Sequence, residues 1–63
     1  MKIWMTVKNV DTGKIWVEDY EIGDEFNPHE WAEKTIQFFN GTLRSHESER
    51  ELIQVLDAKG NKL

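Results

Sequence analysis

The stretch Phe26-Asn27-Pro28-His29-Glu30-Trp31 contains the signals of a helix start, and the rest of the fold follows from it. Asn27 is suited to cap free backbone N–H groups, and Pro28 fits the first turn, where its missing N–H costs nothing. Glu30 stands three residues after the cap, where its carboxylate can bond the Asn27 N–H and face the helix dipole. The sequence therefore predicts a helix that begins at Pro28.

The predicted helix runs to about Asn40, and Gly41 is expected to stop it just past the last turn. On a helical wheel, the side chains suited to face a core occupy one arc. These side chains are Trp31, Ala32, Thr35, Ile36, Phe38 and Phe39. The remaining side chains are polar, so the pattern predicts an amphipathic helix lying on a sheet.

Two segments of alternating polarity precede the helix, at residues 2–10 and 15–22, with a turn at Asp11-Thr12-Gly13-Lys14 between them. A type I turn closed by a Gly13 bulge predicts an antiparallel hairpin. Its expected cross-strand pairs are Val7 with Val17, Thr6 with Glu18, and Trp4 with Tyr20. This register places one apolar set on the helix side: Ile3, Met5, Val7, Ile15 and Val17.

Residues 51–57 are apolar on both sides of the pleat and predict a third strand. The sequence thus predicts one α+β domain over residues 1–63, a small ββαβ fold with one helix packed on one sheet face. A right-handed crossover places the third strand beside the first and antiparallel to it, in the order 2-1-3. Placement beside the second strand, parallel to it, is the alternative.

The composition narrows the classes of function. The 63 residues include no cysteine, so neither disulfides nor thiolate metal sites are available. Twelve acidic against eight basic residues give a net charge of −4, which opposes long-range attraction to nucleic acid. The chain shows no signal-peptide pattern and no apolar run of about 20 residues. We therefore expect a cytoplasmic protein.

The predicted register leaves aromatic rings on the sheet face away from the helix, because one helix covers only one face. Exposed aromatic surface of this kind usually marks a contact site, and Trp and Tyr are enriched in interface hot spots. We expect a protein interface, either a homodimer or a contact with another protein, formed by Trp4, Trp16 and Tyr20 as anchors with Lys8 and Glu18 between them. A different register, or a covering tail or 42–49 loop, would remove this surface.

The same aromatic face suggests a second function, the stacking of single-stranded nucleic acid. Its phosphates would meet Lys2, Lys8, Lys14, Arg44 and Arg50. A secondary protein-contact loop is expected at Arg44, His46 and Arg50. No catalytic residue, metal site or cofactor is predicted, since His29 and Glu33 lack a third ligand and His46 lies on a polar loop.

Residues 39–55 carry the segment Phe39-Asn40-Gly41-Thr42-Leu43-Arg44, followed by Glu47, Arg50-Glu51-Leu52-Ile53 and Val55. This segment resembles a pattern in small uncharacterised phage and prophage proteins. Many of those proteins have Pro-Gly after the Arg, where this chain has Ser45-His46. The resemblance implies phage origin, action in the cytoplasm of an infected bacterium, and binding or inhibition of a host protein. It implies no catalytic residues.

Overall fold

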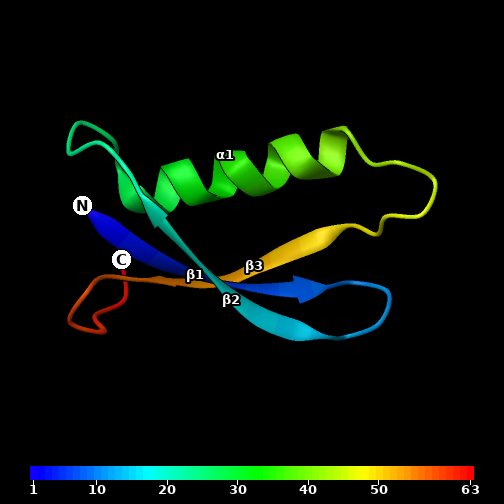
Figure 1. Cartoon of the computed structure of the whole chain (residues 1–63), viewed down its shortest axis with the longest axis horizontal. Helices are drawn as coiled ribbons and strands as arrows, with labels where there is room; N and C mark the ends of the chain where they lie inside the picture. The colour runs from blue at the N-terminus through cyan, green and yellow to red at the C-terminus, as the bar shows by residue number, and fades with distance from the viewer.

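The structure, a computed structural model, describes all 63 residues as a three-stranded sheet with one helix packed against it (Figure 1). The elements are β1 (Lys2–Asn9), β2 (Ile15–Glu21), α1 (Pro28–Gly41) and β3 (Arg50–Leu56). β1 is the central strand, and β2 and β3 both pair with it antiparallel. The predicted ββαβ fold and 2-1-3 order are confirmed, and the alternative with the third strand beside the second is excluded.

The start of α1 confirms the prediction. The Asn27 side chain accepts a hydrogen bond from the Glu30 N–H at 3.0 Å, and Pro28 opens the first turn. Of the two bonds in the predicted capping box, only this one is formed. The cap therefore depends on Asn27 alone.

The predicted stop at Gly41 is wrong, because Gly41 is the last helical residue and lacks a positive φ. Thr42 caps this end instead. Its hydroxyl donates to the Phe38 carbonyl at 3.0 Å, and its N–H donates to the Phe39 carbonyl at 3.1 Å. Since these bonds satisfy two of the free carbonyls of the last turn, the helix needs no left-handed residue there.

The core lies between α1 and the inner face of the sheet, and it is small. Its buried residues are Ile3, Met5, Val7, Ile22, Ala32, Ile36 and Val55. The buried side of the helix centres on Ala32 and Ile36. Phe38 falls at the far end of the predicted arc and is 75% exposed, so its assignment to the core side is wrong.

β1 and β2 pair one residue away from the predicted register. Thr6 pairs with Val17 rather than Glu18, and Trp4 pairs with Asp19 rather than Tyr20. Because side chains alternate along a strand, this shift turns β2 over. Ile15 and Val17 therefore lie on the side away from the helix, and the predicted apolar set of five is wrong in these two members.

The hairpin loop explains the shift. Asn9 pairs with Lys14, through a bond of 2.8 Å from its N–H to the Lys14 carbonyl, so the loop holds Val10–Gly13. This loop is one residue longer than the predicted one. The Asn9 side-chain oxygen accepts bonds from the N–H groups of Asp11 and Thr12, at 2.9 and 3.0 Å. This side chain stabilises the longer loop and hence the observed register.

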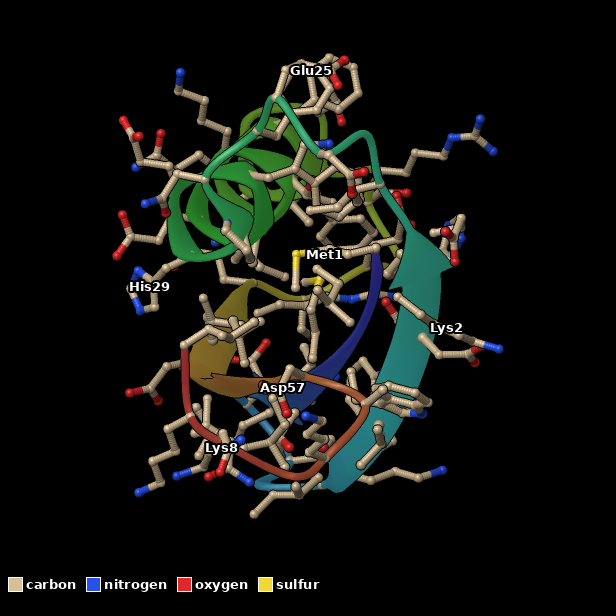
Figure 2. All side chains as sticks on the ribbon, turned by 90° about the vertical axis from the view of Figure 1, so that its left-hand side faces the viewer. Met1, Lys2, Lys8, Glu25, His29 and Asp57 are labelled. Carbon is tan, nitrogen blue, oxygen red and sulfur yellow. The ribbon has the colours of Figure 1, made fainter.

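The helix is not centred on the sheet. It packs mainly against β3, and Figure 2 shows β2 at the side of the sheet away from the helix. β3 also contains a bulge, because its register with β1 shifts between the pairs Thr6–Gln54 and Val7–Leu52 and leaves Ile53 without a partner. The inner side of β2 is therefore only partly covered.

Candidate protein interface

The sheet face away from α1, called the open face below, is defined by the register of the three strands. Cross-strand partners share a face, so the partners of alternate β1 residues belong to it. The open face comprises Lys2, Trp4, Thr6 and Lys8 of β1; Ile15, Val17, Asp19 and Glu21 of β2; and Glu51, Gln54 and Leu56 of β3.

Apolar side chains lie uncovered on the open face. Ile15 and Val17 are 58% and 59% exposed. Trp4 is partly exposed on the central strand, with Leu56 as its direct partner and Val17 as a diagonal neighbour. Together these side chains form the apolar row of the open face, in which Ile15 and Val17 are exposed and Trp4 and Leu56 are partly exposed.

Charges of both signs surround this row. The Lys2 ammonium lies 5.6 Å from the centre of a Trp4 ring and 3.4 Å from the Asp19 carboxylate. Gln54 donates to the Thr6 hydroxyl at 3.4 Å. The open face thus has an apolar centre with a mixed polar border, as protein interfaces commonly have.

The structure divides the predicted interface between two faces. Trp4 and Lys8 lie on the open face as expected, whereas Trp16, Glu18 and Tyr20 lie on the helix side, because β2 is turned over. The prediction that these five residues form one surface is wrong for this physical reason. The three aromatic rings proposed to stack nucleic acid do not share a face either.

On the helix side, the Glu18 carboxylate joins two aromatic side chains of the same strand. Trp16 Nε1 donates to Glu18 Oε2 at 2.9 Å, and the Tyr20 hydroxyl donates to Glu18 Oε1 at 2.8 Å. The three residues alternate along β2 and therefore project to one side. A carboxylate two residues from each of two aromatic donors is the sequence signal that could have predicted this contact.

Arg50 of β3 completes this arrangement, which we call the Glu18 cluster: Trp16, Glu18, Tyr20, Trp31, Phe39 and Arg50. An Arg50 guanidinium nitrogen lies 3.6 Å from Glu18 Oε2. The guanidinium carbon lies 3.7 Å from the centre of the Phe39 ring and 5.0 Å from that of a Trp16 ring. Arg50 is thus held by a carboxylate and two aromatic faces, a role that the sequence did not predict.

The helix contributes Trp31 to the Glu18 cluster, where it packs against Tyr20. The rings of Tyr20 and Trp31 lie 5.3 Å apart and are tilted by 57°. Burial raises the pKa of Tyr20 above its ordinary value, and the hydrogen bond to Glu18 raises it further. The phenol therefore stays protonated and continues to donate to Glu18 at neutral pH.

The predicted secondary contact loop is not one surface. Arg44 and His46 are exposed in the 42–49 loop, where the Arg44 N–H donates to the Glu47 carboxylate at 2.9 Å. Arg50 belongs to the Glu18 cluster on the helix side of the sheet. The structure therefore separates Arg50 from the contact role proposed for this loop.

Metal-binding groups, pockets and membrane-spanning helices are the remaining features that could indicate a function. His29 and Glu33 lie 3.2 Å apart on the exposed side of α1, and no three His, Asp or Glu side chains gather as in a metal site. The surface has no enclosed pocket. The single helix lacks the length and apolar character needed to cross a bilayer.

Comparison of the chain with protein families, curated proteins and solved structures gives no match.

Proposed function

We propose that this chain is a small protein-binding module whose contact surface is the open face. The observation that carries the proposal is the exposure of Ile15 and Val17, at 58% and 59%, beside the partly exposed Trp4. Exposed apolar surface with a polar border is typical of protein-contact sites on monomers. The proposal gives the chain no catalytic step and no cofactor.

The specific form of the proposal is a homodimer packed open face to open face. A two-fold interface must be self-complementary, and Lys2 and Lys8 together with Asp19 and Glu51 offer both signs on this face. A dimer also adds burial to a chain in which only 7 of 63 residues are buried. Both considerations favour a second copy as the partner.

Sedimentation velocity from micromolar to near-millimolar concentration tests this form. The wild-type chain should double in mass as concentration rises. Val17→Lys places a charge in the apolar row and should weaken the dimer about tenfold or more, which is about 1.4 kcal/mol or more. Phe38→Lys is the matched control, because it makes the same change at a side chain that is 75% exposed on the helix. Equal weakening by both variants contradicts the open-face dimer.

A strict monomer would overturn the homodimer and make a foreign protein the form to test. The resemblance of residues 39–55 to phage proteins makes a bacterial host protein the first candidate, and a cytoplasmic location belongs to the same proposal. Val17→Lys should then abolish binding to that protein, and Phe38→Lys should preserve it.

A further inference from the structure

The outer edge of β2 carries backbone groups that meet no partner in the sheet. The ladder with β1 begins at Asn9, which bonds Lys14, and ends at Met1, which exchanges bonds of 2.7 and 2.9 Å with Ile22. Bonded and non-bonded pairs alternate in an antiparallel ladder, so the even-numbered residues of β2 bond to β1. The outward N–H and C=O groups belong to Ile15, Val17, Asp19 and Glu21.

The outer edge of β3 is closed at both ends. At its start, the Asn40 side chain accepts from the Arg50 N–H at 2.8 Å and donates to the Arg50 carbonyl at 2.9 Å. At its other end, the Leu63 N–H donates to the Val55 carbonyl at 2.9 Å. The bulge at Ile53 interrupts the edge between these points. Caps and bulges of this kind protect edge strands from pairing with other chains.

β2 has none of these protections. Its seven residues contain no proline and no bulge, and no tail or helix pairs with its edge (Figure 2). An unbroken free edge is the usual site for addition of an extended segment from another protein. The difference between the two edges is the main support for the inference.

The charge of β2 indicates which segment fits. The strand contains Glu18, Asp19 and Glu21 but no Lys or Arg. Glu18 faces Arg50. Asp19 and Glu21 pair only at the surface, Asp19 with the exposed Lys2 and Glu21, which is 74% exposed, with the Met1 ammonium at 3.5 Å. A second copy would bring two acidic strands together along this edge, and like charges opposite each other destabilise a pair. A basic segment would place favourable charges there.

We propose that the outer edge of β2 binds an extended segment of another protein as a fourth strand. Lys or Arg at alternate positions of the segment would lie beside Asp19 and Glu21 on the open-face side. The intervening apolar residues would lie beside Trp16 and Tyr20 on the helix side. This site goes beyond the open-face contact, because it is formed by the backbone at the edge of β2. Like charges disfavour a second copy of the chain at this edge.

The probe for this site is a blocked synthetic peptide of alternating lysine and valine. Hydrogen exchange followed by NMR should show that the peptide slows exchange at the amides of Ile15, Val17, Asp19 and Glu21 by about tenfold or more, with the effect falling as salt rises. A peptide with glutamate in place of lysine is the matched control. No slowing at near-millimolar peptide, equal slowing by the glutamate peptide, or slowing at β3 instead would overturn the proposal.

Two variants sharpen the test. Val17→Pro removes an outward N–H without removing a bond to β1, a position where an edge strand accepts proline. The double change Asp19→Lys with Glu21→Lys keeps the backbone and reverses the charge, and it covers the case in which the proline variant does not fold. Both should abolish protection by the lysine peptide while the inward amides of Trp16 and Tyr20 stay protected. Unchanged protection in the charge variant would overturn the proposal.

These outcomes are separate from those of the dimer test. Exchange reports on the edge amides, whereas sedimentation reports on the mass of the particle. A strict monomer that binds the lysine peptide would overturn the homodimer and support the edge site. A dimer that does not bind the lysine peptide would support the homodimer and overturn the edge site.

Discussion

On the helix side of the sheet, polar groups near the core have partners, whereas on the open face apolar side chains remain in water. No buried side-chain nitrogen or oxygen lacks a hydrogen-bond partner, and the Glu18 carboxylate alone accepts two bonds. Across the same strand, Ile15 and Val17 are more than half exposed. The contrast teaches that side-chain direction, more than residue type, decides which groups stabilise this fold.

The largest expected effect compares two isoleucines on opposite faces. Ile3 is fully buried and Ile15 is 58% exposed. Ile3→Ala should lower the free energy of unfolding by about 3 kcal/mol, since it leaves a cavity in the core. Ile15→Ala should lower it by about 0.5 kcal/mol, because the exposed side chain loses only strand preference. Urea unfolding followed by circular dichroism measures both.

If the alanine variant of Ile3 does not fold, Ile3→Val and Ile15→Val make the same comparison with losses of about 1 kcal/mol and near zero. Equal losses at the two positions would show that the faces do not differ as the structure describes.

Neighbouring carboxylates of β2 give the next largest difference. Glu18→Gln replaces an acceptor of two bonds by an amide whose NH2 group faces a donor, and it should cost about 1–2 kcal/mol. Asp19→Asn should cost about 0.5 kcal/mol or less, because its pair with Lys2 is exposed. Thermal unfolding of the two variants checks this order, and a larger loss for Asp19→Asn would contradict the Glu18 cluster.

The loop Val10–Gly13, which is linked to the register of β1 and β2, can be destabilised by a single substitution. Asn9→Ala removes the acceptor for the Asp11 and Thr12 N–H groups and should cost about 1 kcal/mol. The register should persist, because the core still selects the same side of β2. NMR contacts between Val7 and Trp16 report the register. Contacts between Val7 and Val17 in this variant would show that Asn9 alone fixes it.

The smallest expected effect on stability concerns the N-terminal amine of Met1, which bonds Asp24 in the loop after β2 at 3.0 Å. The hydrogen bond to Asp24 raises the pKa of the Met1 amine above its ordinary 8.0, and the charges of Asp24 and Glu21 add to this. A raised pKa in the folded state gives stability that is complete below pH 8 and is lost as pH rises through the raised value.

The urea midpoint of the wild-type chain should therefore fall more between neutral pH and about pH 9.5 than that of Asp24→Asn, with Tyr20 still protonated. If the urea midpoints of the two chains changed equally with pH, the Met1 amine would not contribute to stability.

Much of the fold followed from local chemistry. Asn27 and Pro28 marked the helix start, and the alternation of Ile3, Met5 and Val7 predicted the inner side of β1. The direction of β2 did not follow, because Ile15 and Val17 alternate with Trp16 and Tyr20, and either pair makes an apolar side. The observed direction depends on a loop one residue longer, which the Asn9 side chain stabilises, and on the packing of Trp16 and Tyr20 against the core.

The site was less predictable than the fold. Trp4 was placed correctly on the face without a helix, but the contact of Arg50 with Glu18 depends on β1, which lies between their strands. No local pattern encodes such a contact across the sheet. The protection of β3 by Asn40 and Leu63 likewise joins residues that only the tertiary fold brings together.

The three indoles of this chain are divided between the faces, with Trp4 on the open face and Trp16 and Trp31 in the Glu18 cluster. Each face thus has its own intrinsic fluorophore. Replacing Trp16 and Trp31 by phenylalanine would leave Trp4 as the only indole, and its emission would shift to the blue when a partner covers the open face. The molecule therefore needs no attached dye to report which of its surfaces is occupied.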